Sequence, residues 1–194
     1  GNPNGAVNIA GDALLIWFWV GLQMVAFLVG DVWRAFNPYP TIADSAAWVW
    51  AKLRGEELAS IDAERKPTLW PAVAAIFAYL WFELAYNGLW FQSDPGSASD
   101  PRAIGVFLTV YSATMLAGAS LYGRGWVRTA DGFSVLFSKL AAMSIFHLDE
   151  DRRIRVRPPL AGISMVPPTV GMVPFILVVL GSTTFDGFTR SSLW

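Results

Sequence analysis

The chain has 194 residues, of which 54% are hydrophobic and only 15% are charged, and its formal net charge is −1. A typical soluble domain has about 25% charged residues, so this composition favours a membrane protein, and the small net charge gives no indication of a nucleic-acid partner. The absence of cysteine excludes disulfide bonds, thiolate metal sites and a cysteine nucleophile.

Four apolar segments are predicted to cross a membrane. Three have about the 20 residues that an α-helix needs to span roughly 30 Å of hydrocarbon. The fourth is shorter, and it crosses only if its flanks contribute or the bilayer thins locally. In chain order the segments are 13–33, 69–91, 103–122 and 169–185. The predicted fold class is therefore an all-α membrane protein, with residues 1–194 forming a single integral membrane domain.

The basic residues alternate between the connecting segments. Residues 34–67 contain five Lys and Arg residues and residues 123–168 contain seven. The connection between the second and third spans contains one, and so does the segment after the fourth span. Short loops rich in Lys and Arg remain in the cytoplasm. Both basic loops are therefore predicted to be cytoplasmic, and both ends of the chain to lie outside.

Each basic loop contains a predicted helix. In the first loop, the segment from Asp44 to Gly55 is predicted to be a short amphipathic helix, with Trp48 and Trp50 at the lipid headgroups. In the second loop, Asp131 is predicted to cap a helix with one apolar face. That face comprises Phe133, Leu136, Phe137, Leu140 and Ala141. Two interpretations stay open: this helix lies at the membrane interface, or it packs in the interior.

A small cytoplasmic hairpin is predicted after that helix. Arg153, Arg155 and Arg157 alternate with Ile154 and Val156, and a period of two is typical of a strand. Two interpretations of the arginines stay open. They contact anionic lipid headgroups, which is worth about 1 kcal/mol each, or they belong to a solvated strand.

Glu83 lies inside the second predicted span, where a charged side chain costs about 2.5 to 3.5 kcal/mol on insertion scales. Either it bonds a neighbouring helix, or it has a ligand-binding, proton-carrying or catalytic role. Because the second and fourth spans both run outward, polar residues of both are predicted near the same leaflet. They are Glu83, Tyr86, Asn87, Ser182, Thr183, Thr184 and Asp186. These residues form an outward-facing polar pocket if the two spans face each other; otherwise Asp186 is a solvated loop residue.

The end of the first span contains a second polar pair. Asp31 and Arg34 are three residues apart, on neighbouring positions of one helical face, and are predicted to form an ion pair at the interface. Pro38 then ends the helix, and Asn37 is suited to a cap or a turn.

The chain offers few groups for metal or nucleophilic chemistry. His147 is the only histidine, which excludes a histidine-rich zinc, copper or haem site. A magnesium or calcium site built from carboxylates alone stays open, but its ligands have no recognisable spacing here, and neither a metal nor a cofactor is predicted. A Ser-His-Asp triad would need His147, which the charge pattern places in the cytoplasm, away from the serine and aspartate candidates. The sequence has no phosphate-binding glycine loop and no G-x-S-x-G motif.

Nine motifs are notable as an ordered set: FWVGL, GDVWRAFNPY, LWPA, WFELAY, DPRAIGVFLTVY, YGRGW, DGFSVLFSKLA, RVRPPLAGI and LGSTTFDGF. Together they extend over nearly the whole chain, which thereby resembles a bacterial multi-pass membrane family, common in actinobacteria, that is labelled fenitrothion hydrolase. The resemblance implies the bacterial cytoplasmic membrane, a longer parent chain with further spans on both sides, and hydrolysis of organophosphate esters. It assigns no catalytic residues.

Two functions are predicted. The favoured one is a non-catalytic membrane subunit or a transporter-like helical bundle, whose partners are the lipid bilayer and further membrane helices or protein subunits. The alternative is a membrane-embedded hydrolase of organophosphate esters. In that case Glu83 or Asp186 is the general base, and one hydroxyl among Ser182, Thr183 and Thr184 is the nucleophile or oxyanion donor. The first is favoured because the sequence supplies no histidine-rich metal site and no base of a suitable type.

Overall fold

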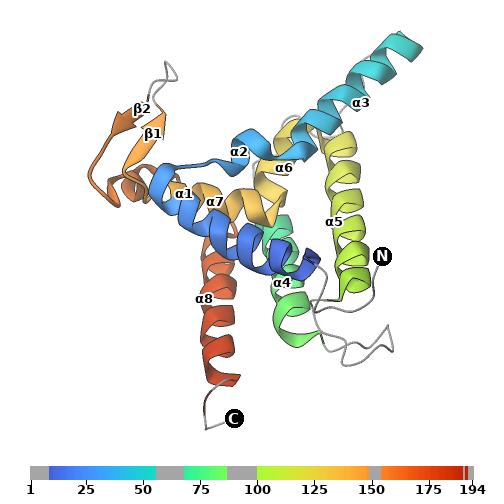
Figure 1. Cartoon of the computed structure of the whole chain (residues 1–194). Coiled ribbons are helices and arrows are strands. Elements are labelled where there is room, and N and C mark those ends of the chain that lie inside the picture. The colour runs from blue at the N-terminus through green and yellow to red at the C-terminus, as the bar shows by residue number, and fades with distance from the viewer. Residues whose placement is uncertain (1–8, 56–67, 87–99, 149–153, 190, 192–194) are drawn as a thin grey trace.

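The computed structural model describes residues 9–55, 68–86, 100–148, 154–189 and 191, and these residues are mostly helical (Figure 1). In chain order the elements are η2 (Asp12–Gly21), α1 (Leu22–Val29), α2 (Trp33–Phe36), α3 (Pro38–Arg54), α4 (Trp70–Ala85), α5 (Pro101–Tyr122), α6 (Arg124–Ala130), α7 (Gly132–Ala141), β1 (Phe146–Leu148), β2 (Ile154–Val156), η3 (Ala161–Met165) and α8 (Met172–Thr189). η2 is a π-helix that continues into α1, and η3 is a 3-10 helix. The predicted helical class is confirmed.

Three helices of the described part are long and apolar enough to cross a membrane. They are Asp12–Val29, Pro101–Tyr122 and Met172–Thr189, and they correspond to the first, third and fourth predicted spans. The second predicted span corresponds to α4, a shorter apolar helix of 16 residues. Positions 87–91 of that prediction lie outside the described residues.

Two predicted span boundaries are wrong. The first helix ends at Val29 instead of residue 33, because Gly30 adopts a φ of 121°, which side chains other than glycine rarely allow, and α2 is a separate turn of helix. The fourth span is predicted to end near residue 185, yet α8 continues to Thr189. The polar stretch 182–187 is therefore part of a helix and does not follow one.

α3 begins earlier than its sequence pattern predicts. Asn37 has an extended backbone and accepts a hydrogen bond from the Tyr39 N–H at 3.0 Å, and Pro38 occupies the first helical position, where its missing N–H costs nothing. Pro38 therefore ends one helix and opens the next. The helix ends at Gly55, as predicted, in the left-handed conformation. No residue of α3 is buried, and the helix projects from the rest of the structure (Figure 1).

α7 forms the centre of the core. Six of its ten residues are buried, and it packs against α1 and α4. The ring of Phe133 contacts Phe18, Tyr79 and Tyr111, with ring centroids 4.9 to 5.4 Å apart. These three rings come from η2, α4 and α5, so one side chain joins three helices. Of the two interpretations left open for this helix, the structure shows the buried one.

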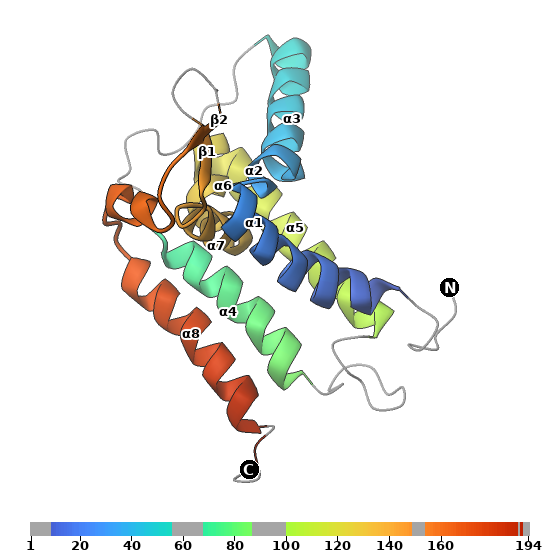
Figure 2. The ribbon, with the colours of Figure 1, turned by 60° about the vertical axis from the view of Figure 1, so that its left-hand side comes forward.

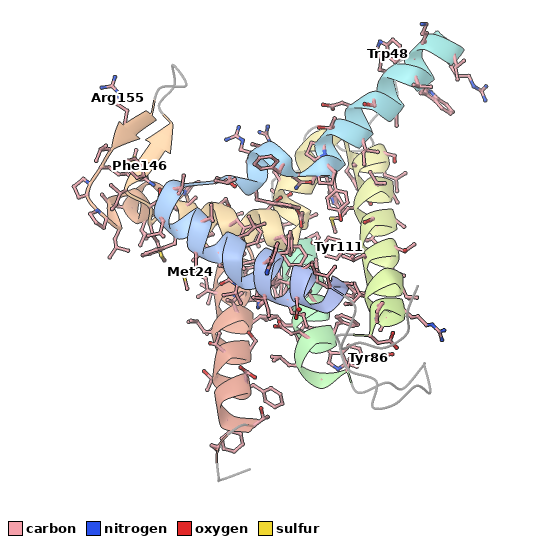
Figure 3. All side chains as sticks on the ribbon, viewed as in Figure 1. Met24, Trp48, Tyr86, Tyr111, Phe146 and Arg155 are labelled. Atoms are coloured by element: carbon pink, nitrogen blue, oxygen red, sulfur yellow. The ribbon has the colours of Figure 1, made fainter. Side chains whose placement is uncertain are left out.

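The predicted hairpin is present. β1 and β2 pair antiparallel, with His147 opposite Arg155, and Arg155 projects from the sheet (Figure 3). Arg157, just after β2, has a role that the sequence pattern did not indicate: its guanidinium donates to the carbonyls of Ala141, Ala142 and Ser144 at 2.9 to 3.1 Å. A cation that binds the last carbonyls of a helix caps its C-terminus. Arg153 lies outside the described residues.

α4 and α8 lie side by side and start at the same level (Figure 2). Their starts are joined by a parallel bridge between Thr68 and Val170, in which the Leu69 N–H donates to the Val170 carbonyl at 2.8 Å. The end of α4, the end of α8 and the start of α5 lie toward one end of the structure, and the hairpin and α3 lie toward the other (Figure 2). The helices thus bring residues near 83 and near 186 to similar depths.

Candidate functional site

Asp131 is the most deeply buried ionisable acidic or basic residue in the described part of the chain. It is fully buried, and it occupies the sharp junction between α6 and α7. Its backbone is extended, and its Oδ1 accepts the Phe133 N–H at 3.1 Å, which is the predicted N-cap of α7. Burial of a carboxyl group is tolerated only where hydrogen bonds replace water.

Four further hydrogen bonds reach the same carboxyl group. The Tyr111 hydroxyl donates to Oδ1 at 2.5 Å. Oδ2 accepts from Ser134 Oγ at 2.6 Å, from Asn37 Nδ2 at 2.9 Å and from Trp33 Nε1 at 3.3 Å. A carboxylate has about four lone-pair sites, so these five donors fill its acceptor capacity. Asp131 is therefore a structural centre that joins α2, the start of α3, α5 and α7, with no lone pair left for a substrate or metal ion.

Sequence reasoning found only the capping role of Asp131. Its other partners, Trp33, Asn37 and Tyr111, lie 98, 94 and 20 residues away. Asn37 additionally donates to Ser134 Oγ at 2.8 Å, which ties the partners to one another. One signal was available: Tyr111 and Asn37 are polar groups next to apolar segments, and such groups need partners when buried.

Glu83 and Asp186 lie toward the same end of α4 and α8. Both are half-buried, and their carboxyl groups are close enough for their charges to repel each other. Tyr79, one helical turn before Glu83, is fully buried, and its hydroxyl has no hydrogen-bond partner among the described residues. The Tyr86 ring stacks on Phe82, with centroids 5.4 Å apart. Asn87 lies outside the described residues.

The three hydroxyls of α8 bond to their own helix. Ser182 donates to the Val179 carbonyl at 2.7 Å, whereas Thr183 and Thr184 both donate to the Leu180 carbonyl, at 2.8 and 3.0 Å. Back-bonding of this kind satisfies a hydroxyl inside an apolar helix. A nucleophilic hydroxyl instead donates its proton to a general base, and within the described residues these three hydroxyls donate only to carbonyls of their own helix.

A groove of about 370 Å³ runs between α4 and α8. Of the ten residues that line it, nine are apolar residues or glycine, and the tenth is Ser182. Neither Glu83 nor Asp186 lines it. The space between these two helices is therefore suited to an apolar group.

Asp31 and Arg34 are joined through the backbone. The Arg34 N–H donates to Asp31 Oδ1 at 3.1 Å, so the aspartate supports the first turn of α2 in place of the expected side-chain ion pair. Burial raises the pKa of Asp31, and the Arg34 backbone bond and charge oppose this only in part.

No group of three or more metal-ligating side chains occurs within the described ranges. His147 lies in the hairpin, opposite Arg155, at the other end of the structure from Glu83 and Asp186. Comparisons with protein-family models, with curated proteins and with solved structures find no match for this chain.

Proposed function

We propose that this chain is a non-catalytic, multi-pass membrane protein, a subunit or helical bundle whose apolar helices contact lipid and other membrane helices. One observation carries the proposal: of the 18 residues of α8, only Phe175 is buried. Its exposed large apolar residues are Val173, Ile176, Leu177, Leu180, Phe185 and Phe188. Each Å² of such surface left in water costs about 25 cal/mol, so a lipid or protein environment is favoured.

The first helix supports the same environment. Within Asp12–Val29 only Leu14, Trp19 and Ala26 are buried, although the segment has a high mean hydropathy. A helix that is apolar on every face and covered on only one is typical of a membrane span. The apolar groove between α4 and α8, and the filled acceptor sites of Asp131, are consistent with packing and provide no reaction centre.

The proposal includes the bacterial cytoplasmic membrane, with the two basic loops inside and both ends of the chain outside. The charge alternation of the sequence supports this orientation. A cysteine in place of Ser97, in a chain without native cysteine, is expected to react with an impermeant maleimide added outside intact cells. Reaction only after the cytoplasmic face is opened would reverse the orientation.

Spin labels on α8 test the membrane proposal directly. Single cysteines at Ile176 and Leu180, on the exposed side, are expected to show high accessibility to oxygen and low accessibility to a water-soluble relaxation agent. A cysteine at Phe175, the buried position, provides the matched control with low accessibility to both. Lipid and partner helices both exclude the water-soluble agent, so high accessibility to it at 176 and 180 would overturn the proposal.

The hydrolase alternative is kept because Glu83 and Asp186 lie near each other. The purified chain in lipid nanodiscs is expected to cleave an aryl phosphotriester no faster than empty nanodiscs do. Turnover that Glu83→Gln and Asp186→Asn abolish, while Asp44→Asn on exposed α3 retains it, would establish the hydrolase instead.

A further inference from the structure

A pocket of about 700 Å³ lies where the first helix ends. Its walls come from the segment between Val29 and Ala35, from the C-terminal half of α7, from Phe146 of β1 and from Arg157. Figure 3 shows Phe146 beside the end of α1. The pocket is separate from the groove between α4 and α8 and from the Asp131 network, which share none of its lining residues.

Two guanidinium groups line this pocket. The Arg34 side chain is exposed, and it donates no hydrogen bond within the described part of the chain. Arg157 uses Nε and Nη2 for its three carbonyl bonds, which leaves Nη1 without a partner among the described residues. The Arg157 guanidinium also packs closely against Gly162, where an added Cβ would lie only 2.3 Å from Cζ and Nη1. The pocket thus presents one fixed and one adjustable donor of positive charge.

The remaining lining is mainly apolar, and its two polar side chains are Asp31 and Ser138. Val29, Val32 and Phe146 supply apolar surface, and Ser138 supplies a hydroxyl that donates to the Val135 carbonyl and can still accept a hydrogen bond. Asp31 is the single acid in the wall, against the two arginines. The charge of Arg34 acts on Asp31, so this acid offsets part of the positive charge of the two arginines.

The level of the pocket relative to the membrane indicates which kind of anion it binds. The first candidate span ends at Val29, and the pocket begins at that residue, so it lies at the level where hydrocarbon meets headgroups. Basic pockets next to membrane helices on the cytoplasmic side bind anionic headgroups. A ligand with a phosphate next to glycerol and acyl carbons fits a wall that combines guanidinium groups with valine and phenylalanine.

We propose that this pocket binds the phosphodiester headgroup of an anionic phospholipid, with Arg34 and Nη1 of Arg157 donating to the phosphate. The same phosphate chemistry is present in free inorganic phosphate, and the two sources are separable by experiment. The proposal rests on the membrane placement proposed above. The spin-label result at 176 and 180 tests that placement independently of lipid selectivity.

The experiment measures which lipids stay bound to the purified chain, by native mass spectrometry, after exchange from nanodiscs containing equal amounts of phosphatidylglycerol and phosphatidylcholine. The wild type is expected to retain phosphatidylglycerol about tenfold over phosphatidylcholine, and Arg34→Gln to reduce this preference about five- to tenfold, as loss of one charge-assisted hydrogen bond implies. Arg128→Gln, an exposed arginine outside the pocket, is the matched control and is expected to change it less than twofold.

Because Arg34 is exposed, its replacement is expected to leave the unfolding midpoint in zwitterionic nanodiscs unchanged. Equal loss of preference in Arg34→Gln and Arg128→Gln would overturn the proposal, since it would indicate general surface attraction. Displacement of bound phosphatidylglycerol by millimolar inorganic phosphate would overturn the lipid assignment. Retention of both lipids in proportion to their supply would overturn the site altogether.

Discussion

Two regions of this chain contain almost the same four residues and use them in opposite ways. Asp131-Gly132-Phe133-Ser134 opens α7 and is buried, whereas Asp186-Gly187-Phe188-Thr189 closes α8 and is largely uncovered. The first aspartate accepts five hydrogen bonds from four parts of the chain. The second lies beside Glu83 near the end of an exposed helix. The structural role of this four-residue motif therefore depends on the elements that pack around it and not on its amino-acid sequence.

The two aspartates are expected to show the largest difference. Asp131→Ala removes the acceptor of Trp33 Nε1, of the Tyr111 hydroxyl and of one of the two Asn37 Nδ2 hydrogen bonds. Each unpaired buried donor costs about 1 to 3 kcal/mol, so a loss of at least about 3 kcal/mol in the free energy of unfolding is expected. Asp186→Ala is expected to change it by less than about 0.5 kcal/mol. Chemical unfolding in mild detergent measures both. A loss at Asp186 as large as that at Asp131 would contradict the comparison.

The two phenylalanines come next. Phe133 is 4% exposed and contacts rings of three helices, so Phe133→Ala is expected to cost about 3 to 5 kcal/mol. Phe188 is 45% exposed, and Phe188→Ala is expected to cost less than about 1 kcal/mol in the same measurement. Phe133→Leu, which keeps most of the volume, is a control that should recover much of the loss. Similar costs at 133 and 188 would show that α8 is as well packed as α7.

The two glycines are expected to differ in sign. A Cβ at Gly132 would lie 2.8 Å from the Ile76 N and 3.1 Å from its Cα, so α7 could not approach α4 as closely, and Gly132→Ala is expected to cost about 1 to 3 kcal/mol. Nothing lies within 4 Å of a Cβ at Gly187, so Gly187→Ala is expected to stabilise the helix by up to about 1 kcal/mol. The midpoints of thermal unfolding should move in opposite directions.

A third aspartate, Asp31, is half-buried. Its replacement is expected to give the smallest change in the free energy of unfolding. Its folded-state pKa is raised above the ordinary value of 3.8, mainly by burial. The folded state therefore binds more protons than the unfolded state, and this contribution to stability is present below about pH 3.8 and is lost as the pH rises through the folded-state pKa. Asn does not titrate, so Asp31→Asn does not lose this stability as the pH rises. The difference in unfolding free energy between Asp31→Asn and wild type should rise with pH and then level off; a flat difference would contradict the buried position of Asp31.

Much of the fold follows from local pattern. The apolar lengths predicted the helices, Asp131 was recognisable as a cap because it precedes an apolar face with helical spacing, and the alternation around Arg155 predicted the hairpin. The boundary errors have local causes that composition does not reveal. Gly30, with its positive φ, ends the first helix early, whereas α8 continues through Gly181 and Gly187.

The candidate sites were less accessible to sequence reasoning. Glu83 and Asp186 were placed at one depth by counting spans, and the structure places them toward the same end of adjacent helices. The partners of Asp131 and the capping role of Arg157 were not found, because the bonds join segments far apart in the chain. The groove between α4 and α8 is apolar for a similar reason: its lining depends on the rotation of each helix about its axis.

A helical chain that is apolar enough for a bilayer is predictable from local sequence, because helix length, hydropathy and caps are properties of contiguous residues. The packing of the helices, in contrast, makes Asp131 fully buried and leaves Asp186 half-buried. It also decided that Arg34 and Arg157 meet in one pocket. The free energy of a polar group depends on which donors and how much water surround it, and those neighbours are brought together only when the helices pack.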